Sequence, residues 1–303
     1  MKTQLDISEL LENFRDDLDV MNSTREQYYT TVRLFFKWII QNGYNWRELG
    51  ISHIIKYKNF HYDAGTSEYT IRTYLVTIKI FFKWIAKNGI YSNISEGIKL
   101  PKLPKHYSKK PLSEDQVHSL MLSIDKSTQL GLRDYAFISL LIVTGLRSIS
   151  VEQMDIGDIK DRNGTLIVWY KNKGSRHKDR FKPLTNKCTD AINDYLLTRP
   201  GFKNHWPLFV SHSISSKGKR LSRRSMRDAF NKHLKAIDIK EKQITLHSLR
   251  HTHGVISTMK LGAYETQLSL DHRSEQTTRI YNQSADEELR LQNRSGKVLD
   301  AIL

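Results

Sequence analysis

Residues 100–112 read LPKLPKHYSKKPL, with three prolines, four lysines and no acidic residue. Proline lacks an amide hydrogen and its ring breaks a helix, so this stretch is predicted to be an extended basic linker. A chain of 303 residues also exceeds the usual size of one domain. The expected organisation is therefore a helical domain at 1–99, the linker at 100–112 and a second domain at 113–303.

The composition favours packed, mainly helical domains. Hydrophobic residues make up 39% of the chain and aromatic residues 10%, with only six prolines and fifteen glycines. Cys188 is the only cysteine, so neither a disulfide framework nor a cysteine zinc site is possible. The acidic start of the chain does not resemble a signal peptide, and no long apolar run is present. We expect a cytoplasmic protein that does not bind a membrane.

The net charge of +16 predicts a polyanionic partner. Nucleic acid is the leading candidate, because neutralising phosphates releases counterions and gives strong, salt-sensitive binding. Residues 217–235 alone hold eight basic residues and one acidic residue. The sequence SRRSMR within them begins a predicted helix, whose amides also favour anions. The candidate DNA contacts in this half of the chain are Lys109, Lys110, Arg223 and Arg224.

The first domain is predicted to contain helices at about 7–21, 23–42, 50–62 and 67–88, with Ser23 and Glu26 as a capping box. Two of these helices contain similar segments, TVRLFFKWIIQNGY at 31–44 and TIKIFFKWIAKNGI at 77–90, each ending in an Asn-Gly cap signal. They are either two similar core helices or a duplication. The predicted core stripes are Leu34, Phe35, Trp38 and Ile39, and Ile80, Phe81, Trp84 and Ile85. The flanking candidates for DNA contact are Arg33, Lys37, Lys79 and Lys83.

The second domain is predicted to be helical with one β-hairpin. The hairpin pairs TLIVWY (165–170) with RFKPL (180–184) across the loop KNKGSRHKD. A capping box, SEDQ, opens the first helix. The helices are expected at about 113–124, 131–144, 186–198, 222–237, 246–261, 264–270, 274–283 and 285–299.

The histidine-rich stretch TLHSLRHTHG occupies 245–254. His247 and His251 have the spacing of a helical zinc site, but the glutamate of H-E-x-x-H is missing and the cationic Arg250 lies between them. We therefore expect no metal. His247 and Arg250, three residues apart, share one helix face and suit phosphate binding, because a guanidinium pairs bidentately with phosphate oxygens.

Other residues with the same chemistry occur on both sides of this stretch. Arg147 follows Gly145 at the end of an apolar helix, a place where a buried guanidinium needs a partner. Lys173 precedes a glycine in the hairpin loop, and His272 is followed by Tyr281 nine residues later. In this order, the segments TGLR, KG, HSLRHTH, LDH and TTRIY resemble the signature of the tyrosine recombinases, the lambda-integrase family.

The resemblance covers essentially the whole chain. It implies a mainly α protein with a small β-hairpin or sheet, in which a SAM-like helical domain and a catalytic domain form a C-shaped DNA clamp. It implies that Tyr281 attacks a DNA phosphodiester to give a 3′-phosphotyrosyl link. Arg147 and Arg250 would hold the phosphate, while Lys173 would protonate the leaving oxygen. His247 would assist proton transfer and His272 would bind the phosphate. No metal, cofactor or ATP is implied.

The sequence departs from the family pattern at two positions. Ser150 stands where the family usually has an acidic residue, and Asp271 replaces the glycine of Leu-Gly-His, which puts the fine geometry of the site in question. Lys171 and Lys178 remain competitors for the role of general acid. His251 and His253 are interpreted as packing neighbours.

The implied function is site-specific recombination of double-stranded DNA at an inverted-repeat core site. A homotetramer, or a heterotetramer with a related recombinase, would act through a Holliday junction, and the C-terminal tail helix would dock on a neighbouring protomer or on its own chain. Because the sequence begins directly at the helical domain, it resembles Xer-like or mobile-element enzymes. The alternatives are a type IB topoisomerase-like activity and a non-catalytic DNA-binding regulator.

Overall fold

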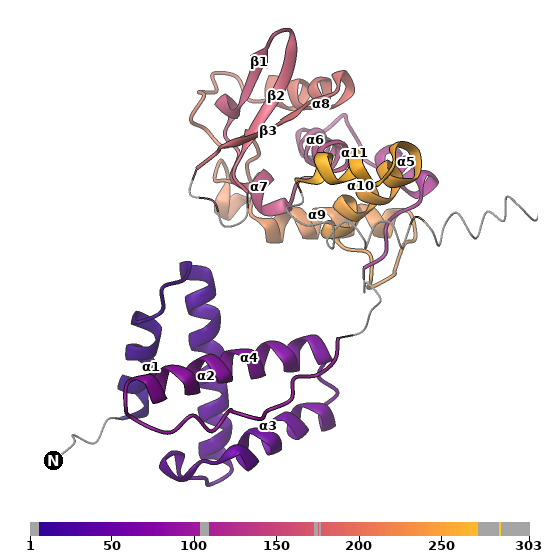
Figure 1. The fold of residues 1–303 in the computed structure, drawn as a ribbon. Coiled ribbons are helices and arrows are strands. Elements are labelled where there is room, and N and C mark those ends of the chain that lie inside the picture. The colour runs from indigo at the N-terminus through magenta and orange to yellow at the C-terminus, as the bar shows by residue number, and fades with distance from the viewer. Residues whose placement is uncertain (1–5, 104–108, 173–174, 176, 272–284, 286–303) are drawn as a thin grey trace, which may run out of the picture. The chain divides into compact units, whose positions relative to one another are not determined.

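The computed structural model describes residues 6–103, 109–172, 175, 177–271 and 285 (Figure 1). The chain forms two compact units, Met1–Lys105 and His106–Leu303, and each is described by itself. The structure is mostly helical, with one small sheet in the second unit, as the sequence predicts. Within the described ranges, no helix is both long enough and apolar enough to cross a membrane.

The first unit is a helical bundle in which α2 packs against α1 and α4, and α3 packs against α4. Figure 1 shows these helices in indigo and purple. The expected helix ends are confirmed where Gly43 and Gly89 follow α2 and α4 with left-handed φ angles of 71° and 65°. The helices are α1 (Ile7–Asp16), α2 (Asn22–Gln41), the short 3-10 helix η1 (Trp46–Glu48), α3 (Ile51–Asp63) and α4 (Glu68–Lys87).

The core of this unit corrects two details of the sequence prediction. Leu34 is 42% exposed, whereas Phe36 is 2% exposed. The buried face of α2 follows the helical spacing i, i+3, i+4, i+7, which includes Phe36 and turns Leu34 to solvent. The predicted Ser23 capping box is also wrong, because α2 begins at Asn22 with Met21 as its N-cap and no side-chain cap bond. Ser23 therefore lies inside the helix.

The second unit is built around α6 (Gln129–Thr144), which packs against α8, α9 and α10. Most of its side chains are buried, as its apolar sequence predicts. The capping box of the first helix is confirmed, because the Ser113 hydroxyl accepts from the Gln116 amide and the Gln116 side chain accepts from the Ser113 amide. The other helices are α5 (Glu114–Leu122), α7 (Ser148–Glu152), α8 (Asn186–Leu197), α9 (Arg223–Ala236), α10 (Leu246–Leu261) and α11 (Ala263–Leu270), with the short 3-10 helices η2 (Ile156–Asp158) and η3 (Ile214–Ser216).

The sheet has three antiparallel strands in the order β1 (Ile159–Arg162), β2 (Thr165–Tyr170) and β3 (Arg180–Pro183). The predicted hairpin is β2 and β3, with Val168 opposite Lys182 and Tyr170 opposite Arg180. β1 was not predicted, because its sequence IKDR is mostly exposed and has no apolar alternation. The turn that joins it to β2 is Asn163-Gly164, with φ angles of 55° and 79°. An Asn-Gly pair is the usual hairpin signal, so the turn sequence indicates the β1–β2 hairpin although the sequence of β1 does not.

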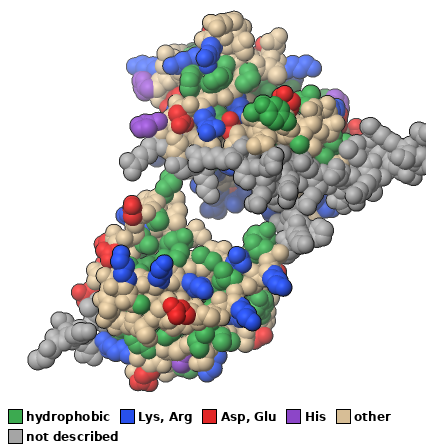
Figure 2. Space-filling view, in the orientation of Figure 1, with side chains coloured by type: hydrophobic (Ala, Val, Ile, Leu, Met, Phe, Trp, Pro, Cys, Tyr) green, Lys and Arg blue, Asp and Glu red, His purple; other side chains and the backbone are tan. Residues whose placement is uncertain are grey.

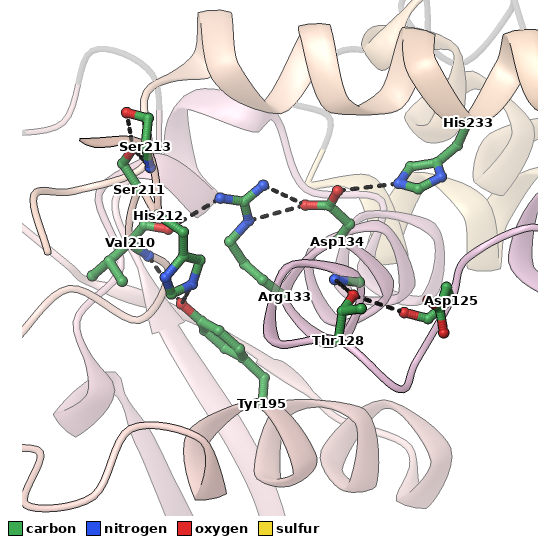
Figure 3. A network of polar contacts seen from close by, with 11 residues as sticks. Asp125, Thr128, Arg133, Asp134, Tyr195, Val210, Ser211, His212, Ser213 and His233 are labelled. Carbon is green, nitrogen blue, oxygen red and sulfur yellow. Dashed lines mark hydrogen bonds and ion pairs between the residues drawn. The ribbon is translucent and has the colours of Figure 1, made fainter. Parts of the chain in front are cut away.

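A buried polar network ties α6 to α9 and to the segment that follows α8 (Figure 3). The Arg133 guanidinium donates to Asp134 Oδ1 from Nε at 2.9 Å and from Nη2 at 2.7 Å. Asp134 Oδ2 lies 3.1 Å from His233 Nε2, and Arg133 Nη1 donates to the Val210 carbonyl at 3.3 Å. Removing one partner of such a network leaves an uncompensated buried charge. This network therefore fixes the helices around which the rest of the unit packs.

Candidate active site

Arg147 lies between the end of α6 and the start of α7. Gly145 ends α6 in a left-handed conformation, with φ at 60°, and Arg147 is the N-cap of α7. The Arg147 side chain is half-buried rather than buried as predicted, because it lies at the junction between the two helices. Its Nη1 donates to Asn172 Oδ1, at the end of β2, at 3.1 Å. This contact joins the arginine to the hairpin.

Arg250 is buried in α10 and is 5% exposed. Its Nη1 donates to the Gly145 carbonyl at 2.5 Å, and its Nη2 donates to the Leu270 carbonyl at 2.8 Å. The first contact reaches the end of α6 and the second reaches the end of α11. A guanidinium is planar, so two such contacts fix the orientation of its whole fork. Arg250 is thus held by the ends of two other helices.

His247 stands at the start of α10 with an exposed side chain. Desolvation by the surrounding protein lowers its pKa, and the positive charges of Arg250, Arg147 and Lys109 lower it further. The two arginines and the linker lysine therefore act electrostatically on one imidazole, although they come from widely separated parts of the sequence. With a pKa below its ordinary value of about 6.5, His247 is neutral at pH 7 and able to accept a proton.

The other two histidines of the motif lie deeper in the fold. His251 is 1% exposed, and burial, together with the charge of His247, lowers its pKa to about 4. His253 Nδ1 donates to the Ile142 carbonyl at 2.9 Å, and its Nε2 forms a hydrogen bond with Ser269 Oγ. Both are packing neighbours in this structure. Among the described residues, no group of three or more His, Cys, Asp or Glu side chains is placed to hold a metal ion.

The structure describes two of the three candidate lysines of the hairpin, and these two have different surroundings. Lys173 lies outside the described residues. Lys171 is half-buried at the end of β2. Lys178 Nζ lies 2.8 Å from Asp155 Oδ2 and 2.6 Å from Asp158 Oδ2. Burial lowers the pKa of Lys178, but its bonds and charge interactions with the two carboxylates outweigh burial and raise the pKa. Lys178 is therefore a poor proton donor.

His272 and Tyr281 also lie outside the described residues, so the structure does not place them relative to the arginines. Among the described residues, Arg250 contacts the end of α6 two residues before Arg147, and the charges of Arg147, Arg250 and Lys109 act on His247. Lys109 is predicted as a DNA contact, but its electrostatic effect on His247 is not. No local sequence signal reports that effect, because the two residues lie in distant parts of the sequence.

Ser150 occupies the position of the family's acidic residue and has a definite contact. Its side chain is buried, and its hydroxyl donates to the Lys171 carbonyl at 2.8 Å. Lys171 precedes Asn172, which binds Arg147. Ser150 therefore supports the end of β2 next to the arginine, through a hydroxyl where the family uses a carboxylate.

Asp271 has the second unexpected role. Its backbone is left-handed, with φ at 50°, a conformation that a glycine adopts without strain. Its carboxylate accepts from the Tyr170 hydroxyl, lies 2.7 Å from Lys182 Nζ and lies 3.3 Å from Arg180 Nη1. The aspartate thus joins the end of α11 to strands β2 and β3.

Two of the predicted DNA contacts of the second unit, Arg223 and Arg224, lie near His247. A hollow of about 590 Å³ is bordered by His247 and by Arg223 and Arg224 at the start of α9. Arg223 binds Glu152 through both its amide and its Nε, so its charge is partly compensated. The Arg224 side chain is 85% exposed. Lys110 forms an exposed ion pair with Glu241 at 2.8 Å.

The predicted contacts of the first unit lie on the flanks of α2 and α4. Arg33, Lys37 and Lys83 are exposed, whereas Lys79 is half-buried and donates to the Ile98 carbonyl at 3.4 Å. Figure 2 shows Lys and Arg side chains spread over the visible face of this unit. These groups are available to a polyanion, with Lys79 the least exposed of the four.

Comparison with known proteins gives consistent matches along the chain. The profile of the Phage integrase family matches residues 110–288, and that of the phage integrase N-terminal SAM-like domain matches residues 9–89. The tyrosine recombinase XerC of Caldanaerobacter subterraneus subsp. tengcongensis is 32% identical over 206 residues, which cover 66% of this chain and 54% of the relative. The match therefore spans about half of that relative's length.

Two solved structures share the fold. One is the XerH site-specific recombinase bound to a palindromic difH substrate after cleavage, with a TM-score of 0.73, 20% identity and coverage of 94% of this chain and 83% of that one. The other is a lambda integrase tetramer bound to a Holliday junction, with a TM-score of 0.69, 16% identity and coverage of 92% and 78%. At these identities the likeness establishes the fold.

Proposed function

Because the chain belongs to the phage integrase family, we propose that it is a site-specific tyrosine recombinase, which cuts and rejoins double-stranded DNA through a covalent protein–DNA intermediate. The observation that carries this proposal is that Arg250 binds the Gly145 carbonyl, two residues before Arg147, with His247 one helical turn before Arg250 on α10. Two guanidinium groups and an imidazole, whose pKa the charges of Arg250, Arg147 and Lys109 lower, suit an anion that must also exchange a proton. A phosphodiester at the moment of attack is such an anion.

In the proposed reaction the phenol oxygen of Tyr281 attacks the phosphorus, and His247 accepts the phenol proton. The bond from phosphorus to the 5′-oxygen breaks, and that oxygen takes a proton from Lys173. The products are a 3′-phosphotyrosyl ester and a free 5′-hydroxyl. Rejoining reverses these transfers with a 5′-hydroxyl from another strand. The ester conserves the energy of the broken bond, so ATP is not consumed.

Arg147 and Arg250 would bind the non-bridging oxygens and stabilise the charge that develops on them. Removal of one preorganised donor of this kind costs about 10²- to 10³-fold in rate. Arg250 suits this role because the ends of α6 and α11 fix its orientation before DNA binds. His272 would add a hydrogen bond to the phosphate. The reaction assigns no role to a metal.

The proposed partner is duplex DNA with an inverted-repeat core site, bound by four protomers that exchange strands through a Holliday junction in the cytoplasm. The solved lambda integrase tetramer on a Holliday junction supports this stoichiometry by similarity of fold. Lys109, Lys110, Arg223 and Arg224 in one unit, and Arg33, Lys37, Lys79 and Lys83 in the other, are the proposed backbone contacts. The slope of log K against log salt concentration is negative, and removing one side chain that binds a phosphate should make it less steep by about 0.9. Arg224→Ala should therefore show a larger change than Arg223→Ala, whose arginine already binds Glu152.

The test uses a library of random-sequence duplexes, each with a nick that lets the cleaved fragment diffuse away. Wild-type protein is incubated with the library, and DNA that stays bound after denaturation is sequenced. We expect recovery of a common inverted repeat. Recovery of covalent adducts without any common sequence would instead favour a type IB topoisomerase-like activity. A non-catalytic regulator would retain DNA only before denaturation.

A second experiment identifies the general acid. The substrate carries sulfur in place of the 5′-bridging oxygen, and a thiolate leaves without needing a proton. Lys173→Ala should slow cleavage of the oxygen substrate and leave cleavage of the sulfur substrate near the wild-type rate. Lys171→Ala is the matched control from the same loop and should behave alike on both substrates. Rescue of Lys171→Ala but not of Lys173→Ala would reassign the acid.

A further inference from the structure

Asp271 is the centre of a polar cluster that links three elements of the second unit. Its carboxylate contacts Lys182 and Arg180 of β3 and the hydroxyl of Tyr170 of β2. These contacts join residues from distant parts of the sequence. The strands involved are the two that flank the hairpin loop, and Asp271 immediately precedes His272.

Lys182 makes this cluster more than a surface ion pair. The residue is 8% exposed, and its Nζ donates to the Ser269 carbonyl at 2.6 Å as well as contacting Asp271 at 2.7 Å. Burial lowers the pKa of Lys182, and the bond and charge of Asp271 oppose that effect. A buried ammonium whose carboxylate partner is removed is strongly disfavoured. The two charges therefore depend on each other.

The cluster also bears on the orientation of Arg250. Three consecutive residues at the end of α11 are each held by a cation from another element. Lys182 binds the carbonyl of Ser269, Arg250 binds the carbonyl of Leu270, and Lys182 and Arg180 bind the carboxylate of Asp271. Any movement of this segment moves the Leu270 carbonyl, and with it one of the two groups that orient the Arg250 guanidinium.

We propose that Asp271 and Lys182 form a positioning pair that holds the end of α11 against the hairpin and thereby fixes the orientation of Arg250 for phosphate binding. The proposal rests on the proposed function for the identity of the phosphate. It also accounts for an aspartate at a left-handed position that favours glycine. The strain at that position is offset by contacts that a glycine cannot make.

The test compares three variants with one matched control. Asp271→Asn keeps a residue that tolerates the left-handed conformation but removes its charge. Lys182→Met keeps an unbranched chain and removes the opposite charge, and the double variant removes both. Asp134→Asn is the control. It also removes a buried carboxylate with a cationic partner in the same unit, but its contacts are with Arg133 and His233.

The first readout is single-turnover cleavage of a nicked duplex recovered from the library, at saturating protein and below the unfolding temperature. We expect each single variant to slow cleavage by about tenfold, and the double variant to be no slower than the worse single, because coupled residues are not additive. DNA affinity should stay unchanged. Asp134→Asn should lower the unfolding temperature but leave cleavage by folded protein unchanged.

The second readout needs no DNA. The Nε–H resonance of Arg250, identified by its loss in Arg250→Lys, should shift in Asp271→Asn and in Lys182→Met and stay in place in Asp134→Asn. An unmoved resonance in both variants would overturn the proposal, and so would multiplicative rate losses in the double variant. If wild-type protein forms no adduct with any duplex, the proposed function fails, while the resonance comparison still decides whether the pair positions Arg250.

Discussion

Replacing Gly145 with alanine tests how α6, α10 and α11 meet at the candidate site. Gly145 ends α6 with φ at 60°, and its carbonyl accepts a hydrogen bond from Arg250. A Cβ atom placed on this residue would lie 2.6 Å from Leu270 Cδ2 and 2.7 Å from His253 Cδ2. Both distances are well inside van der Waals contact, so the substitution must displace the side chain of Leu270 or of His253.

Two costs add at this position. A left-handed conformation costs a non-glycine residue about 1 kcal/mol or somewhat more. Forcing an extra carbon into a packed contact costs about 1–3 kcal/mol. We expect Gly145→Ala to lower the free energy of unfolding by about 3 kcal/mol. For a unit of this size that corresponds to a fall in Tm of about 9 °C.

The matched control is Gly164→Ala in the β1–β2 turn. Gly164 also has a positive φ, of 79°, but a Cβ there would meet nothing within 4 Å. It should show only the conformational cost, about 1 kcal/mol and about 3 °C in Tm. Calorimetry of the full chain measures both variants through the transition of the second unit. Equal losses of stability for the two variants would refute the contact at Gly145.

Two further predictions concern groups near the arginines. Ser150→Ala should cost about 1 kcal/mol of stability, since it removes the hydrogen bond from the Ser150 hydroxyl to the Lys171 carbonyl, and it should slow adduct formation. Ser139→Ala changes another buried serine of the unit and should leave the rate of adduct formation unchanged. The lowered pKa of His251, about 4, predicts that this residue contributes a loss of stability between about pH 6.5 and pH 4, because the unfolded chain binds the proton first. This loss of stability reaches about 3 kcal/mol. Denaturant titrations at a series of pH values should show that the free energy of unfolding falls less steeply with acid in His251→Gln. An unchanged dependence on pH would contradict the lowered pKa of His251.

Much of the fold follows from local patterns in the sequence. The helical periodicity of α2 and α4, the Asn-Gly ends of both and the alternation of TLIVWY each report structure within a few residues. Leu34 and Phe36 show where this information stops. Both are apolar and lie near the same stripe, and only the packing of α2 against α1 and α4 decides which of them is buried.

The candidate site can also be predicted only in part from the sequence. Arg147, His247 and Arg250 carry recognisable motifs, so the sequence alone predicts a site role for them, and that role stays a prediction. The contacts that orient them could not be predicted, because Asp271 meets Tyr170 and Lys182 across long stretches of chain. Ser150 and Asp271 depart from the family pattern, and no local pattern in the sequence indicates which residues they contact. In the structure, both make defined contacts that support the hairpin and the end of α11.

The proposed function requires that this chain form a covalent bond to DNA through Tyr281. The most direct measurement is a denaturing gel of wild-type protein and Tyr281→Phe, each incubated with a recovered nicked duplex in the presence of a chelator. We expect a protein–DNA adduct for wild type, none for Tyr281→Phe, and equal DNA affinity of the two proteins before denaturation. An adduct that survives the Tyr281→Phe substitution, or one that the chelator abolishes, would show that the proposed reaction is wrong.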